Sequence, residues 1–150
     1  MGNFLVNDIN IMILWYQYNN NEWSVCIIEH SMHLNNEPFQ LMKNEVKTIE
    51  VRLNDEKRQE IKSGDYIVFK NLTTEETLKV QVKEIVVFSS FQSLLNQYTN
   101  EEIGAKADDQ LSQKLAAIYQ IYSQTDELNY GALAIKVALI WWKWNYLIYS

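Results

Sequence analysis

The polar residues with the clearest chemistry lie together on one predicted strand, residues 48–53. Side chains alternate along a strand, so Thr48, Glu50 and Arg52 share one face. Lys47 stands at the entry of the strand, where a bend brings its long stem to that face. These residue types suit a phosphate or a base edge, because arginine presents a rigid fork and glutamate accepts from an exocyclic amine. The alternative is an exposed face with a surface ion pair, worth less than about 1 kcal/mol, and composition alone favours this alternative.

Other reactive residues in the sequence do not form a pattern typical of catalysis or metal binding. His30 and His33 lack partners at metal-ligand spacing, so we expect no metal and no cofactor. Cys26 lies in an apolar run and is expected to pack there. Tyr130 is expected at a turn before Gly131, and it is the tyrosine best placed to stack on a base.

Length and charge restrict the class of protein. The chain has 150 residues, 47% of them hydrophobic, which suffices for one compact domain with a packed core. Its formal charge of −6 argues against tight, sequence-independent binding of duplex nucleic acid, because that affinity comes from phosphate neutralisation. Nine of the 13 basic residues lie between Lys43 and Lys83, so a polyanion would meet this segment, whereas the acidic segment 84–127 would repel it.

The hydrophobic pattern predicts short strands with helices between them. Two apolar, β-favouring runs, 11–18 and 23–28, are separated by a polar stretch and predict a hairpin. Further extended segments are predicted at 32–34, 48–53, 66–69, 78–88 and 131–137, and helices at 38–43, 91–98 and about 109–122. This order indicates an α+β protein, a small mixed and partly closed β-barrel with three or four flanking helices. Glu84 falls on the apolar side of its strand, so we expect a β-bulge to turn it outward.

The tryptophans divide the chain into an interior and two ends, because all five lie in the first 23 or the last 10 residues. We expect an N-terminal extension over 1–29, predicted to be a β-hairpin, a domain over 30–137, and a Trp-rich tail over 138–150. The apolar runs are shorter than the roughly 20 residues of a membrane-spanning helix, and no signal peptide is recognisable, so a cytoplasmic protein is expected. The ends either pack on the domain or bind a protein partner.

The interior, 30–137, resembles the ASCH (activating signal cointegrator homology) family of the PUA-like superfamily. The resemblance is carried by short runs in a fixed order: Met32-His33-Leu34, Glu37-Pro38-Phe39, Lys47–Leu53, Ile61–Asp65, Phe91 and Tyr130-Gly131. It implies a mixed barrel of five or six strands with a cleft into which the G-x-K-x-x-E-x-R signature of the family projects. The signature falls here on Lys47, Glu50 and Arg52. Glu45 replaces its glycine, so we expect the turn before the strand to be built differently.

The resemblance also implies a nucleic-acid-binding module that holds RNA or a nucleotide-like ligand in the barrel cleft. Lys47 and Arg52 would contact phosphate or base, and Glu50 would order Arg52 or accept from a base amine. An alternative comes from a bacterial branch that hydrolyses N4-acylated cytidine, for which the catalytic residues would be Lys47, Thr48 and Glu50. Because the threonine nucleophile of that branch corresponds to Glu50, Thr48 would have to take its place. A third alternative is a protein-interaction module that uses its apolar ends.

Overall fold

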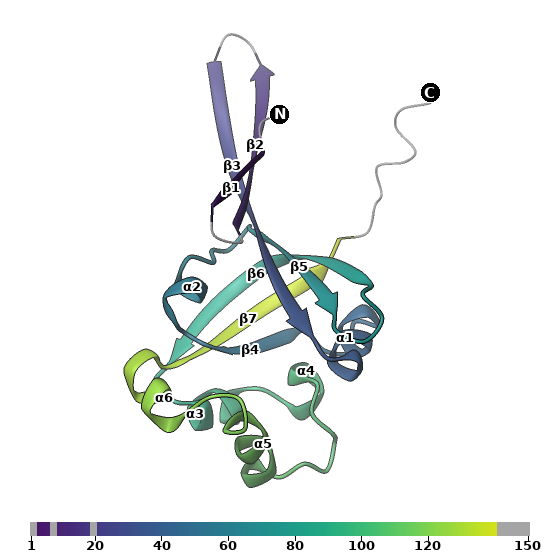
Figure 1. Cartoon of the computed structure of the whole chain (residues 1–150), viewed down its shortest axis with the longest axis vertical. Coiled ribbons are helices and arrows are strands. Elements are labelled where there is room, and N and C mark those ends of the chain that lie inside the picture. Colours follow the sequence, from purple (N-terminus) through teal and green to yellow (C-terminus); the bar gives the residue numbers. More distant parts are fainter. Residues whose placement is uncertain (1–2, 7–8, 19–20, 141–150) are drawn as a thin grey trace.

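A seven-stranded sheet organises the protein (Figure 1). The computed structural model describes the backbone of residues 3–6, 9–18 and 21–140 and the side chains of residues 28–140. The strand order is β1-β2-β3-β5-β6-β7-β4, and every neighbouring pair is antiparallel except β3 and β5. The strands are β1 (Asn3–Val6), β2 (Ile9–Tyr18), β3 (Asn21–Leu34), β4 (Ile49–Leu53), β5 (Tyr66–Asn71), β6 (Thr77–Phe88) and β7 (Ala132–Leu139).

The strands from β3 to β4 in this order curl into a half-barrel, whereas β1, β2 and the first part of β3 form an arm that projects from it (Figure 1). β3 belongs to both parts, because it pairs with β2 up to His30 and with β5 from Glu29 onward. The sequence predicts two separate pieces here, 23–28 and 32–34, and this prediction is wrong. The polar stretch between them continues the strand because His30 is buried and lies 2.8 Å from the carboxylate of Asp65.

Helices cover the half-barrel, and the described part of the chain contains six of them. They are α1 (Asn36–Lys43), α2 (Glu56–Gln59), α3 (Phe91–Gln97), α4 (Asn100–Ile103), α5 (Leu111–Ile118) and α6 (Gln124–Tyr130). The predicted α+β class and partly closed barrel are confirmed, and α3 to α6 lie together on one side of the sheet (Figure 1). The count exceeds the predicted three or four because α2 and α4 are single turns. Side-chain caps from Asp55 and Thr99 begin them, and hydrophobic periodicity does not reveal such caps.

β4 lies between two hydrophobic cores, one on each face of the sheet. Ile49 and Leu53 belong to the outer core, between the sheet and α3 to α6. Glu50 and Arg52 alternate with these residues along the strand and therefore face the inside of the half-barrel. There the cross-strand partner of Glu50 is the inner-core residue Ile135. The predicted division of β4 into two faces is confirmed, but neither face is open to solvent along its length. Glu50 is only 4% exposed.

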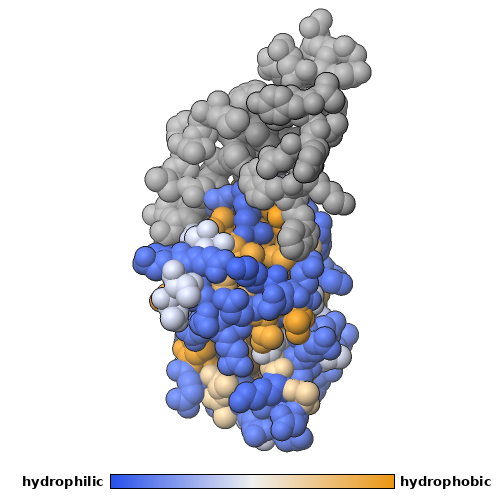
Figure 2. Space-filling view, turned by 90° about the vertical axis from the view of Figure 1, so that its right-hand side faces the viewer, coloured by the Kyte–Doolittle hydropathy of each residue, from blue (hydrophilic) through white to orange (hydrophobic). Residues whose placement is uncertain are grey.

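The surface of the described part is mostly hydrophilic on the face drawn in Figure 2, and its apolar residues come to that surface in separate patches. A register shift between Val82 and Glu84 confirms the predicted bulge, and Glu84 is exposed. The predictions for the Trp-rich ends lie largely outside the described residues. These exclude 141–150, with three of the five tryptophans, and the side chains of Trp15 and Trp23.

Candidate functional site

Three charged side chains lie in contact along the edge strand β4 and the turn before it. Glu50 stands between the other two: Oε1 lies 2.8 Å from Nε of Arg52, and Oε2 lies 3.2 Å from Nζ of Lys47. The side chains of Lys47, Glu50 and Arg52 are 6%, 5% and 18% exposed, so the arginine end is the most accessible. We call this group the charged triplet, and its formal charge is +1. The structure thus brings together the three residues on which the signature falls.

Lys47 is held by the backbone as well as by Glu50. Its Nζ donates hydrogen bonds to the carbonyl oxygens of Ile49, at 2.7 Å, and of Ile103, at 2.8 Å. Ile103 is the last residue of α4, so the lysine fastens the end of that helix to β4. Gly104 makes room for the lysine stem, because a Cβ atom there would lie 2.8 Å from Cδ of Lys47. Gly104 also has a φ of 76°, a left-handed conformation that glycine adopts without strain.

Glu50 depends on its two cationic neighbours. Its Oε2 atom is buried and accepts no hydrogen bond, although Nζ of Lys47 lies within ion-pair distance, because the angle between the two groups does not suit one. A buried carboxylate is costly unless cations compensate it, so both Lys47 and Arg52 are needed beside it. Glu50 therefore contacts these two cations rather than solvent.

Arg52 bridges the two edges of the half-barrel. Its Nη2 donates a hydrogen bond of 2.7 Å to the carbonyl oxygen of His33 in β3, while Nε donates to Glu50. Because β3 and β4 are not paired in the sheet, this side chain spans the gap between them, which we call the seam. The hydroxyl group of Tyr122 also lies near the guanidinium of Arg52 and interacts with its charge. Burial lowers the pKa of Arg52, but Glu50 and Tyr122 more than offset this, so its pKa is raised and the guanidinium remains charged.

A cleft of about 190 Å³ opens on the seam, and we call it the seam cleft. Its lining comes from β3, β4 and α2, and consists of Ser31, Met32, His33, Arg52, Lys57 and Arg58. None of these residues is acidic, although the chain as a whole has a formal charge of −6. Asp55 pairs with Arg58 at 2.6 Å from outside this lining. The cleft is therefore a cationic site in an acidic protein.

Sequence reasoning misses Lys57 and Arg58 as site residues, because the run 54–58 indicates only a polar turn or a single helical turn. A local signal does exist. Asp55 accepts a hydrogen bond from the backbone N–H of Arg58, the three-residue spacing of a capped helical turn. That spacing predicts the turn but not its place, since the position of α2 at the seam depends on how the whole sheet curls.

The aromatic residue beside the triplet is Tyr122 rather than Tyr130. Tyr122 stacks on Phe91, with ring centroids 5.6 Å apart and an interplanar angle of 14°. Tyr130 ends α6 instead of lying in a turn, and its hydroxyl donates to Glu56, 3.2 Å away. That hydrogen bond is the main cause that raises the pKa of Tyr130. The structure therefore places Tyr130 beside α2 and not in the lining of the seam cleft.

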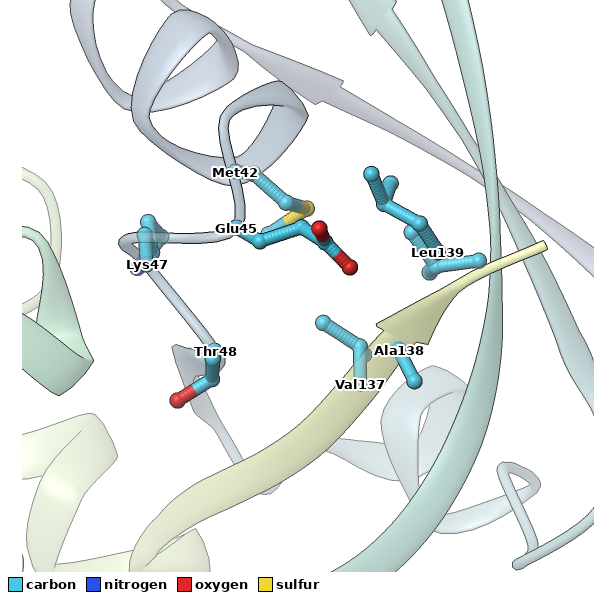
Figure 3. Close-up of a pocket in the computed structure, with 8 residues that line it drawn as sticks. Met42, Glu45, Lys47, Thr48, Val137, Ala138 and Leu139 are labelled. Carbon is cyan, nitrogen blue, oxygen red and sulfur yellow. The ribbon is translucent and has the colours of Figure 1, made fainter. Parts of the chain in front are cut away.

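Thr48 lines a different and smaller pocket, of about 100 Å³, which Glu45, Lys47 and Leu139 also line (Figure 3). Its hydroxyl points away from Glu45 and Leu139 in that view. Within residues 28–140, the hydroxyl makes no hydrogen bond to Lys47, which donates instead to two carbonyl oxygens. These are the contacts of an ammonium donor, so the arrangement does not place a general base beside the threonine.

The turn that leads into β4 has the conformation that glycine favours. Glu45 has a φ of 61°, in the left-handed region, where a residue other than glycine is strained by about 1 kcal/mol. The N–H groups of Glu45, Val46 and Lys47 hold the turn by donating to carbonyl oxygens of Met42 and Leu41. Glu45 therefore takes, at the position of the signature's glycine, a backbone conformation that glycine favours.

Two kinds of feature are absent from residues 3–6, 9–18 and 21–140. No group of three or more histidine, cysteine or acidic residues there is placed to hold a metal ion. None of the helices there is long and apolar enough to cross a membrane.

The curled half-barrel, the helices on one side of it and the cationic seam define the protein as a PUA-related module. The ASCH domain model matches residues 32–140. The chain therefore belongs to the ASCH family, whose domains are PUA-related and generally of an RNA-binding kind.

Two solved structures share this fold over nearly all of their own length. The crystal structure of hypothetical protein PH0355 is 35% identical, with a TM-score of 0.65, and the match covers 75% of this chain and 99% of that one. The solution NMR structure of protein PF0455 from Pyrococcus furiosus is 33% identical, with a TM-score of 0.59, and the match covers 75% of this chain and 97% of that one. None of the curated proteins matches the chain.

Proposed function

We propose that this ASCH domain binds single-stranded RNA, or a nucleotide-like ligand, in the seam cleft. The observation that carries the proposal is the lining of the cleft, which has three cations and no carboxylate in a chain of formal charge −6. Arginine and lysine bind phosphate through charge-assisted hydrogen bonds and through release of its counterions. The seam cleft therefore has the chemistry that a phosphate-bearing ligand requires.

The three members of the charged triplet have different tasks in this proposal. Arg52 lines the cleft and is the one member that meets the ligand. Glu50 fixes the orientation of Arg52 through a hydrogen bond of 2.8 Å, and Lys47 compensates the other carboxylate oxygen. Glu50 and Lys47 are thus positioning residues. Arg58 lines the cleft with a second guanidinium, of which Nη1 donates to Asp55, and its remaining donors would serve the ligand.

The size of the cleft favours a single strand over a duplex. A cavity of about 190 Å³ is smaller than the pockets that hold drug-sized ligands, of roughly 300–1,000 Å³, and suits one base or one sugar phosphate. Duplex binding depends on a long track of cations, which this acidic chain lacks. We therefore expect one or a few nucleotides to be read at a time.

The proposal is tested by titrating a labelled single-stranded RNA of about eight nucleotides, a length typical of single-strand sites, and following its fluorescence anisotropy. In the double variant Lys57→Gln/Arg58→Gln we expect affinity to fall about tenfold and the dependence on salt to weaken. These positions are preferred to Arg52 because Arg52 also bridges the seam. The matched control is Lys62→Gln/Lys106→Gln, which removes the same charge from two exposed lysines outside the cleft.

Two results would overturn the proposal. One is RNA binding by the wild type that the two double variants weaken equally, since this would indicate a general charge effect. The other is no binding of RNA or of free nucleotides at micromolar concentrations.

A further inference from the structure

A second hollow lies on the other side of β4 from the seam cleft, among the helices. We call it the helix groove, and its volume is about 290 Å³, against about 190 Å³ for the seam cleft. Val51 lines the helix groove and Arg52 lines the seam cleft, so consecutive residues of one strand serve opposite faces. The two hollows are therefore separate sites divided by β4.

The helix groove combines apolar walls with a polar rim. Its lining comes from β4, α3, α5 and the end of α4: Val51, Leu95, Ile103, Gly104, Ala105, Asp109, Gln113, Lys114, Ala117 and Ile118. The aliphatic members supply apolar surface against which an aromatic ring is buried favourably. The three polar members lie close together in sequence, on α5 and just before it.

The rim offers both acceptors and donors to a ligand. One carboxylate oxygen of Asp109 accepts from the N–H of Lys106 at 3.1 Å, and the other accepts no hydrogen bond from any residue in 28–140. Lys114 donates to Asn100 at 2.6 Å and retains two further protons. Gln113 accepts from the N–H of Gln110 through its oxygen, which leaves its NH₂ group as a donor.

The charges around the helix groove oppose a phosphate. The segment that borders the groove, 101–114, contains four acidic residues and two lysines, so its formal charge is −2. A dianionic ligand would be repelled here, whereas the seam cleft has no acidic lining. The occupant that suits this lining is largely apolar and uncharged, and it can both donate to Asp109 and accept from Lys114 or Gln113.

We propose that the helix groove binds a neutral nucleobase or nucleoside whose exocyclic amine lies next to a ring acceptor, as in cytosine and adenine. The amine donates to the open oxygen of Asp109, and the ring nitrogen accepts from Lys114 or Gln113, while Val51 and Ile118 cover the faces of the ring. In the same pose, uracil presents a carbonyl where cytosine presents the amine and an N–H where cytosine presents the ring acceptor, so it matches neither Asp109 nor the donors of Lys114 and Gln113. This second site does not depend on the seam cleft.

The experiment measures binding of cytidine, adenosine and uridine to the full chain by isothermal titration calorimetry at millimolar ligand. We expect cytidine and adenosine to bind at least about fivefold more tightly than uridine, because one hydrogen bond to a carboxylate is lost. The key pair of variants is Ala117→Phe and Ala116→Phe, at neighbouring exposed positions of α5 of which only Ala117 lines the groove. Ala117→Phe fills the groove and should weaken binding at least about tenfold, whereas Ala116→Phe should not change it.

Two more variants separate this site from the seam cleft. Asp109→Asn should weaken cytidine about fivefold and reduce the preference over uridine, because the acceptor charge is lost. Lys57→Gln/Arg58→Gln should leave cytidine binding unchanged even where it abolishes RNA binding. The proposal is overturned if the wild type binds none of the nucleosides, if Ala116→Phe weakens binding as much as Ala117→Phe, or if uridine binds as tightly as cytidine. Circular dichroism of each variant shows that a lost affinity is not lost folding.

Discussion

The two ends of the charged triplet share one carboxylate, yet they are held by different parts of the molecule. At one end Lys47 is 6% exposed and donates to two backbone carbonyl oxygens, one of them 56 residues away. At the other end Arg52 is 18% exposed and lines the seam cleft. Residues of one signature therefore have different roles: Lys47 stabilises the fold, and Arg52 is accessible to a ligand.

Replacing Lys47 with methionine tests the buried end and has the largest expected effect. The variant keeps the length of the stem but removes the cation beside Oε2 of Glu50 and the donor to the carbonyl of Ile103. Because it breaks a buried ion pair, we expect the free energy of unfolding in urea to fall by about 3–5 kcal/mol. The control is Lys43→Met, whose partly exposed pair with Glu76 should contribute less than about 1 kcal/mol. Equal, small effects of the two variants would contradict a structural role for Lys47.

Replacing Arg52 with lysine tests the accessible end. The charge is kept, but one ammonium group cannot reproduce the fork that reaches both Glu50 and the carbonyl of His33. We expect the free energy of unfolding to fall by about 1–3 kcal/mol and RNA affinity to fall as well. Arg58→Lys, in the same cleft but not bridging the seam, should weaken RNA binding with a change in stability below about 1 kcal/mol. If Arg52→Lys leaves stability unchanged, the seam does not depend on this side chain.

Replacing Glu45 with glycine tests the turn that positions Lys47. Relief of the left-handed φ of 61° should raise the free energy of unfolding, by at most about 1 kcal/mol because glycine also gains freedom in the unfolded chain. The neighbouring variant Asn44→Gly, at a φ of −87°, brings no such relief and should be destabilising. Thermal denaturation of both variants measures the difference. A lower melting temperature for Glu45→Gly would show that the glutamate side chain stabilises the turn.

The smallest expected effect concerns two tyrosines. Tyr122→Phe removes the hydroxyl group that interacts with Arg52 but keeps the ring that stacks on Phe91, so we expect RNA affinity to change by a factor of about two to five. Tyr130→Phe removes only the hydrogen bond to Glu56 and should leave RNA affinity unchanged. Anisotropy titrations of the two variants decide between them. A larger loss for Tyr130→Phe would show that RNA binding depends on the Tyr130 hydroxyl and its hydrogen bond to Glu56.

The parts of this molecule that the sequence predicts are those that local spacing determines. The alternation along 48–53 places Glu50 and Arg52 on one face, and the structure has them there. The bulge at Glu84 follows from a polar residue on the apolar side of its strand, and it is confirmed. Both predictions need only the two-residue period of a strand.

The parts that escape sequence reasoning depend on distant segments. Lys47 is buried because Ile103 and Gly104 come to lie against it, and nothing near the lysine in the sequence indicates this. Lys57 and Arg58 reach the cleft only because β3 and β4 approach each other when the sheet curls. A cleft assembled from β3, β4 and α2 has no local signature.

One uninterrupted strand, β3, connects the arm to the seam cleft. β3 runs for 14 residues from the arm, past the seam, to just before α1. The carbonyl oxygen of its residue His33 accepts the hydrogen bond from Arg52. The arm and one wall of the cleft are thus parts of one continuous strand, which pairs with β5 from Glu29 onward. A ligand bound in the seam cleft would therefore contact the same strand that forms the arm.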